Sequence, residues 1–229
     1  MLLTHWHHDH VGGVGHVREL VGDGVEVRKF VSGSGSGATS HQEHAAEEWG
    51  VIEDGEVFSC EGVKLRALYS PGHTDDHVGF VLENGAEGKG DDLFAGDNVL
   101  GHGTAVFEDL ALYMASLEKM RGVVGGRLFP GHGEWVEDGK GKVAEYIEHR
   151  KAREREALEV LGRAREDGGK EAGWASMELV KVIYAKYPEA LHGPAEGSLR
   201  HVLRKLQGEG KVREERGRWF LSGREEGRL

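Results

Sequence analysis

Residues 5–10 read His5-Trp6-His7-His8-Asp9-His10 and follow the apolar pair Leu2-Leu3. As an H-x-H-x-D-H pattern, this stretch supplies four side chains that suit a borderline cation such as zinc: His5, His7, Asp9 and His10. Alternate residues of an extended segment point the same way, so His5 and His7 can face one metal. Asp9 and His10 lie where the chain turns and can face another. The stretch predicts a catalytic metal site at a strand end. The alternative is a low-complexity, histidine-rich tract that scavenges metal.

Three further candidate ligands follow short apolar segments, each in a turn that contains glycine. They are His73 in Ser70-Pro71-Gly72-His73-Thr74, Asp97 in Gly96-Asp97, and His132 in Pro130-Gly131-His132-Gly133. Loops at strand ends are where a layered scaffold places its chemistry. We therefore expect all three side chains to join the amino-terminal motif. The alternative is that His73 and His132 cap turns without a metal.

These seven side chains are about the number that two zinc ions need when one carboxylate bridges them. We assign His5, His7 and His73 to the first metal. We assign Asp9, His10 and His132 to the second metal, with Asp97 as the bridge between the two. Two metals about 3.5–4 Å apart make a bound hydroxide available at neutral pH, polarise the substrate oxygen and take up the leaving group. Asp9 is also expected to be catalytic, orienting that hydroxide and transferring a proton.

The rest of the chain reads as two domains, residues 1–142 and 143–229. In the first, hydrophobic patterning predicts strands over 25–31, 51–58, 63–69, 78–83, 93–95 and 127–129, and helices over 14–21 and 110–121. In the second it predicts a long charged helix over 143–165, helices over 177–187 and 196–207, and two short strands around Arg216-Gly217. Helix, helix and hairpin form the outline of a winged-helix module.

Composition limits the class of protein. The 229 residues are 38% hydrophobic and 30% charged, which is typical of a globular protein. No apolar run reaches the roughly 18 residues of a membrane span. Residues 1–142 hold 11 lysines and arginines against 24 aspartates and glutamates, a net charge of -13. Residues 143–229 hold 18 against 16, a net of +2. Neither part has the massed positive charge that attracts nucleic acid.

Cys60 is the only cysteine, so the chain has no internal disulfide. A single cysteine suits a reducing compartment, and we expect an intracellular protein of the cytoplasm or the mitochondrial matrix. We expect Cys60 itself to be a small buried residue.

Taken together, the four ligand-bearing motifs resemble the metallo-β-lactamase superfamily over residues 2–133. The resemblance implies an α+β fold, the four-layered αββα sandwich, with a dinuclear zinc site at one edge. Superfamily members have a first half-sheet of strands before the H-x-H-x-D-H motif. Met1 stands where the motif-bearing strand begins, so we expect a sandwich that lacks those amino-terminal strands.

Two further stretches, 73–77 and 95–110, resemble the LACTB2-like subfamily, whose members carry a winged-helix extension. That group includes endoribonucleases that cut single-stranded RNA. It also includes fungal lactamase-like thioesterases, which release polyketides from an acyl carrier protein in secondary metabolism. We therefore expect a zinc hydrolase that acts on single-stranded RNA. The alternatives are an acyl-carrier-protein thioesterase and a truncated, inactive chain that acts through its winged helix.

The remaining expectations concern substrate contacts. His77 and His102 are expected either to hydrogen-bond a ligand or to contact substrate. An RNA strand would need cationic and aromatic side chains. The candidates in the second domain are Arg200, Arg204, Lys205, Arg216, Arg218 and Trp219. No membrane partner is expected, and the oligomeric state stays open.

Overall fold

The computed structural model describes residues 1–22, 24–32, 49–83, 90–163 and 172–222. The chain divides into two compact units, Met1–Ile147 and Glu148–Leu229. The division falls inside helix α5 (Gly139–Leu161), as does the predicted boundary after residue 142. Within the described ranges, none of the helices combines the length and hydropathy that a bilayer span requires.

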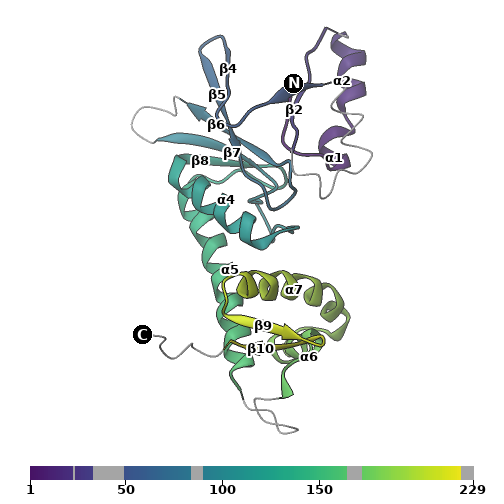
Figure 1. Ribbon diagram of the computed structural model, residues 1–229. Coiled ribbons are helices and arrows are strands. Elements are labelled where there is room, and N and C mark those ends of the chain that lie inside the picture. The colour runs from purple at the N-terminus through teal and green to yellow at the C-terminus, as the bar shows by residue number, and fades with distance from the viewer. Residues whose placement is uncertain (23, 33–48, 84–89, 164–171, 223–229) are drawn as a thin grey trace, which may run out of the picture. The chain divides into compact units, whose positions relative to one another are not determined.

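A three-stranded parallel sheet carries the amino-terminal motif. Its order is β1 (Leu2–Leu3), β2 (Arg28–Phe30) and β3 (Gly50–Ile52). Strand β1 leads through the motif into the one-turn helix α1 (His8–Val11) and then into α2 (Val14–Val21). Leu3, Val14 and Val27 form a small core between α2 and this sheet. Figure 1 shows α2 beside β2.

The second sheet has five strands in chain order: β4 (Val57–Cys60), β5 (Val63–Tyr69), β6 (Val78–Glu83), β7 (Asp91–Gly96) and β8 (Val124–Pro130). Neighbours are antiparallel except β7 and β8, which are parallel. Ile52 of the first sheet packs in one core with Ala67 and Phe80 of the second, so the two sheets face each other. Helix α4 (Leu110–Val123) contacts β7 and β8. These layers confirm the predicted αββα sandwich.

One predicted strand is wrong. Residues 51–58 do not form a single strand, because a turn at Glu53–Glu56 divides them between β3 and β4. The Glu56 N–H donates to the Glu53 carbonyl at 3.1 Å, and Gly55 has φ +81°. The turn sends the chain from one sheet to the other. Cys60 is also exposed rather than buried, because it ends β4 at the open edge of the second sheet.

The second unit confirms the predicted winged helix. Helix α6 (Ser176–Ile183) is followed by the 3-10 turn η2 (Glu189–Leu191), by α7 (His192–Gly208) and by the hairpin of β9 (Val212–Glu215) and β10 (Arg218–Leu221). Arg216 and Gly217 both have positive φ at the hairpin turn. The buried core comprises Leu179, Val180, Leu199, Val202, Leu203, Leu206, Val212 and Trp219.

Candidate metal centre

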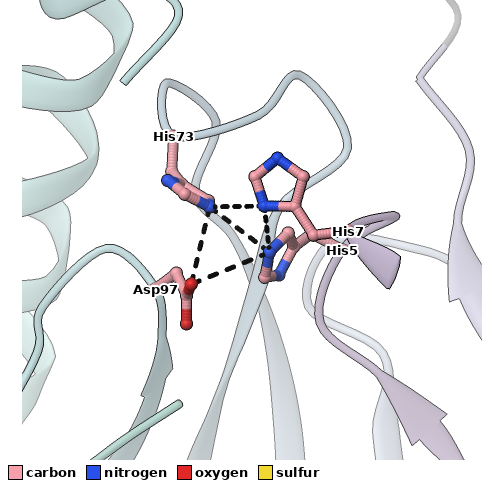
Figure 2. A group of neighbouring side chains, drawn as sticks. All are labelled: His5, His7, His73 and Asp97. Carbon is pink, nitrogen blue, oxygen red and sulfur yellow. Dashed lines mark hydrogen bonds and ion pairs between the residues drawn. The ribbon is translucent and has the colours of Figure 1, made fainter. Parts of the chain in front are cut away.

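The structure brings the seven predicted ligands together from both sheets. They form two groups, and the ligand atoms within each group lie within 4.8 Å of one another. The first group contains His5, His7, His73 and Asp97 (Figure 2). The second contains Asp9, His10 and His132. His73, Asp97 and His132 follow the ends of β5, β7 and β8, so three strand ends meet the motif at one edge of the sandwich.

The spacing of the first group fits a tetrahedral cation. His5 Nε2 lies 2.9 Å from His7 Nδ1 and 3.3 Å from His73 Nε2, and the latter two nitrogens are 3.1 Å apart. Three nitrogens at about 2.0–2.1 Å from one zinc ion are separated by about 3.3 Å. A hydrogen bond between two of these nitrogens needs a proton on one of them, and that nitrogen then has no free lone pair. A cation at the centre instead accepts the lone pairs of all three nitrogens at once.

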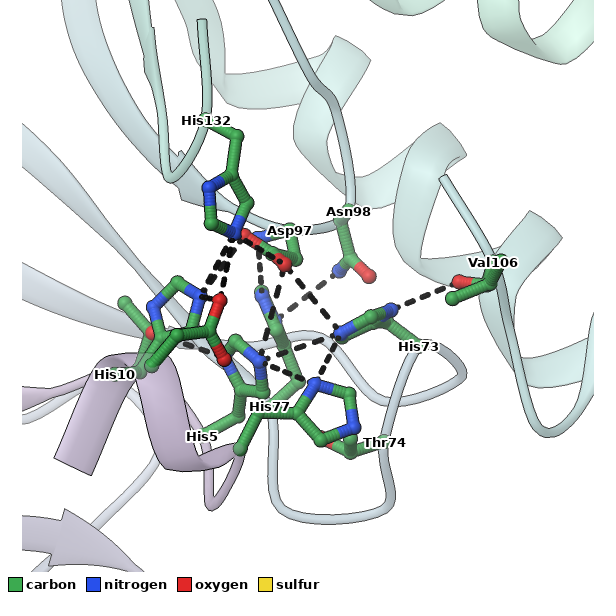
Figure 3. Close-up of polar contacts among 12 residues, drawn as sticks. His5, His10, His73, Thr74, His77, Asp97, Asn98, Val106 and His132 are labelled. Carbon is green, nitrogen blue, oxygen red and sulfur yellow. Dashed lines mark hydrogen bonds and ion pairs between the residues drawn. The ribbon is translucent and has the colours of Figure 1, made fainter. Parts of the chain in front are cut away.

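Hydrogen bonds on the far side of two imidazoles aim their Nε2 atoms at this centre. The Val106 carbonyl lies 2.8 Å from His73 Nδ1, which must therefore carry the proton (Figure 3). Thr4 Oγ1 lies 3.0 Å from His5 Nδ1. The carbonyl can only accept, so it fixes the tautomer of His73 and leaves the Nε2 lone pair of that ring facing the cluster. The Thr4 hydroxyl orients the His5 ring. The sequence patterns did not predict these two contacts. Thr4 is a common polar residue next to the motif, and Val106 acts through its backbone carbonyl.

Asp97 lies between the two groups. Its Oδ2 is 3.7 Å from His73 Nε2 and 3.3 Å from His132 Nε2, while its Oδ1 is 3.4 Å from His10 Nε2. Oδ1 is buried and accepts no hydrogen bond from the part of the chain that the structure describes. A buried carboxylate oxygen without a donor is costly unless a cation meets it. This carboxylate, with imidazoles on both sides, is suited to bridge two metal ions.

The second group is more open. Asp9 Oδ2 lies 3.0 Å from His132 Nε2, and the His10 and His132 Nε2 atoms are 3.2 Å apart. The Asp9 side chain is 58% exposed and that of His132 is 44% exposed, whereas His5 is fully buried. A substrate can therefore reach the second group from solvent more directly than the first.

Electrostatics hold three of the seven side chains, His5, His73 and Asp97, in the protonation state that binds metal. Burial lowers the pKa of His5 and of His73 below the ordinary value. Burial alone would raise the pKa of Asp97, but the neighbouring imidazoles, His10 above all, outweigh it and keep that pKa low. The same contact with Asp97 raises the pKa of His10. Neutral imidazoles beside an ionised carboxylate are the donors that a divalent cation requires.

Position 131 requires glycine because the backbone there lies close to the ligands Asp97 and His10. A Cβ at this position would lie 2.2 Å from Asp97 Oδ1 and 2.9 Å from His10 Cε1. The Gly131 N–H also donates to the Gly96 carbonyl at 2.8 Å, which joins the loops that carry His132 and Asp97. The glycine in the Pro-Gly-His-Gly turn thus lets the β8 loop reach the β7 loop.

His77 and His102 lie in different surroundings. His77 is fully buried behind Asp97, whose backbone N–H donates to His77 Nε2 at 3.2 Å. His77 Nδ1 must then carry the proton, and it donates to Ser70 Oγ at 3.0 Å. His77 therefore holds the backbone of Asp97 and does not reach solvent. His102 is exposed and lies against Gly133, where an added Cβ would come within 2.5 Å of its Nδ1.

Most of the predicted RNA contacts in the second unit are engaged within that unit. Three of the cations form ion pairs, Arg200 with Glu196, Lys205 with Glu154, and Arg218 with Glu178. Trp219 is 5% exposed and its ring belongs to the core of the winged helix. Arg204 and Arg216 are exposed. Four of the six candidates are therefore paired or buried within this unit.

Comparison with known proteins agrees with the fold. The Metallo-beta-lactamase superfamily profile matches residues 1–132, and the Beta-lactamase associated winged helix domain matches residues 175–219. The Beta-lactamase-like protein 2 homolog of Drosophila melanogaster is 39% identical over 217 residues, which cover 93% of this chain and 70% of the relative. Lactamase-like protein nscB of Arthroderma gypseum is 37% identical over 219 residues, covering 93% and 64%. The chain thus spans about two thirds of the length of these curated relatives.

Solved structures share the fold. A beta-lactamase domain protein from Burkholderia ambifaria matches with a TM-score of 0.73 at 20% identity, over 96% of this chain and 73% of that one. A metallo-beta-lactamase family protein from Thermus thermophilus matches with a TM-score of 0.65 at 23% identity, over 96% and 78%. With its H-x-H-x-D-H motif, its two clustered ligand groups and its winged helix, this chain belongs to the metallo-beta-lactamase superfamily, whose members are generally hydrolases.

Proposed function

We propose that this chain is a dinuclear zinc hydrolase that cleaves a phosphodiester bond of single-stranded RNA. The observation that carries the proposal is the convergence of two ligand groups on Asp97, one buried and one open. A buried group suits a metal that stays in place. An open group suits a position at which substrate and water exchange.

The side chains divide into holding and proton-transfer roles. His5, His7 and His73 would hold one zinc ion. Asp9, His10 and His132 would hold the other, and Asp97 would offset the charge of both. When bound, two zinc ions supply Lewis acidity and lower the pKa of a water molecule. Asp9 is the exposed carboxylate of the open group, so its Oδ2 can orient the attacking water and accept or return a proton.

The openness of the second group favours a phosphodiester substrate. Its exposed ligands, Asp9 and His132, let a charged phosphate approach while most of the strand stays in water. A strand that keeps its solvation avoids the cost of burying charge. Because the basic side chains of the winged helix are largely paired with acids, we expect short contacts at the scissile phosphate to dominate binding.

Thioester hydrolysis is the second candidate, and one observation favours it. The Val106 side chain is 70% exposed, although its carbonyl anchors His73. An exposed apolar side chain on the residue that anchors a ligand histidine is suited to contact an acyl chain. The same pairing of basic side chains that limits RNA binding does not affect a small thioester.

A direct comparison distinguishes the two substrates. The zinc-loaded chain is incubated with end-labelled single-stranded RNA and, separately, with an acyl thioester of N-acetylcysteamine. The Asp9→Asn variant and chelator-treated protein serve as controls. We expect RNA cleavage that both controls abolish. Thioester cleavage alone would replace the RNA proposal with the second candidate. Turnover of neither substrate above the Asp9→Asn background would refute both.

A further inference from the structure

A buried lysine lies in the middle of the first sheet, outside the ligand set. Lys29 is the central residue of β2, and its side chain is only 4% exposed. Its ammonium group forms an ion pair with the carboxylate of Asp76, which is fully buried. Lysine and aspartate are almost never fully buried unless they are paired, so this contact accounts for the burial of both.

Asp76 belongs to the loop that carries His73 between β5 and β6. Thr74 donates its hydroxyl to Asp76 Oδ1 at 2.7 Å, so the carboxylate ties the loop to itself as well as to Lys29. A second contact runs from β2 to the same loop. The Phe30 ring stacks on Tyr69 at 4.2 Å between centroids, and the Tyr69 hydroxyl donates to the Asp75 carbonyl at 3.0 Å.

Lys29 is also paired with the strand that enters the motif. In the parallel register, Lys29 lies opposite Leu3, two residues before His5. The Val78 N–H donates to the Thr4 carbonyl at 2.8 Å, directly after the His73 loop ends. The β2 strand therefore contacts both segments that supply the three histidines of the buried ligand group, and the buried Lys29 ammonium is paired with the loop segment.

We propose that Lys29 is a positioning residue for the metal centre, acting through Asp76 to hold His73 against His5 and His7. The inference rests on the proposed zinc function and deepens it. A buried ion pair gives little net stability over an apolar pair of the same volume. Contacts that orient a ligand typically change metal affinity by about 10- to 100-fold. The pair should therefore affect zinc affinity separately from its effect on folding.

Three variants test this separation: Lys29→Met, Asp76→Asn, and the two combined. Each single variant leaves one buried charge without its oppositely charged partner, whereas the double variant removes both charges. Zinc affinity is measured on the full chain by competition with a chromogenic chelator, and the melting temperature is measured without metal. Lys205→Met is the matched control, since Lys205 forms a comparably buried pair with Glu154 in the second unit, with side chains 12% and 10% exposed.

We expect Lys29→Met to melt earlier and to bind the first zinc equivalent about 10- to 100-fold more weakly. The double variant should recover most of the melting temperature but not the affinity. Lys205→Met should lower the melting temperature and leave zinc binding unchanged. Unchanged affinity in Lys29→Met, or recovery of affinity together with stability in the double variant, would overturn the inference alone. Failure of the unaltered chain to bind zinc would overturn the proposed function and this inference with it.

Discussion

The buried imidazole of His77 makes the stability of the metal-free protein depend on pH. Burial lowers the pKa of His77 from 6.5 to about 3. Below pH 6.5 the unfolded chain therefore binds a proton that the folded chain does not, so the stability of the fold falls as the solution becomes acidic. A solution at pH 5 is about 1.5 pH units below the pKa of the imidazole in the unfolded chain. The unfolding free energy is therefore about 2 kcal/mol lower at pH 5 than at pH 7.5.

The assay is urea unfolding of chelator-treated protein at pH 7.5 and pH 5.0, compared between the unaltered chain and His77→Gln. A glutamine amide can accept the Asp97 N–H and donate to Ser70 Oγ, as the imidazole does. His5 and His73 shift in the same direction and are present in both proteins, and burial is the largest cause of each shift, so His77→Gln leaves most of their loss in place. We expect the drop in unfolding free energy to be about 2 kcal/mol smaller in His77→Gln. Equal drops in the two proteins would refute the reasoning.

Three further outcomes follow from the same geometry. Gly131→Ala should weaken binding of the second zinc equivalent at least about 10-fold, because the alanine Cβ would lie 2.2 Å from Asp97 Oδ1. A zinc titration measures this loss of affinity, and an unchanged affinity would contradict the close approach. Asp9→Asn should lower kcat by about 100-fold or more while the first zinc equivalent still binds, as steady-state kinetics and metal analysis will determine; full turnover would remove Asp9 from its proposed role. Zinc at about 100 times its dissociation constant should stabilise the fold by roughly 2.7 kcal/mol, seen as a higher melting temperature that a chelator reverses. An unchanged melting temperature would mean that zinc does not bind the folded chain in preference to the unfolded chain.

The ligand set was accessible from the sequence because its chemistry and its local geometry coincide. Imidazole and carboxylate side chains stand directly after short apolar strands, in turns whose glycines allow close approach. Strand ends on one edge of a sandwich meet in space, so spacing along the chain predicts proximity. The winged helix was predictable for a related reason, since its helices and its hairpin have distinct hydrophobic periods.

Strand boundaries and edge exposure were less accessible. The apolar pairs Val51-Ile52 and Val57-Phe58 suggested one strand, but the Asp54-Gly55 dipeptide between them is a turn signal, and the chain changes sheets at that turn. Cys60 is a small apolar residue in a strand, which favours burial, but its strand is at the edge. The exposure of Cys60 depends on which strands pair, and the pattern of a single strand does not contain that information.

The supporting contacts around the ligands were the least predictable. Lys29 alternates with Val25, Val27 and Val31 on the apolar face of the predicted strand 25–31. A charged residue on that face was the one signal in the sequence that pointed to Lys29. Its partner Asp76 lies 47 residues away in the chain, so the pairing emerges only from the packing of one sheet on the other. The Val106 carbonyl carries no side-chain signal at all, since any residue supplies the same acceptor.

The central claim is that two ligand groups share Asp97 and hold two metal ions. The most direct test is to titrate chelator-treated protein with zinc and to repeat the titration on His73→Ala and His132→Ala. We predict two tight equivalents for the unaltered chain, with one lost in each variant because the two histidines belong to different groups. A single equivalent in the unaltered chain, or none, would contradict the claim.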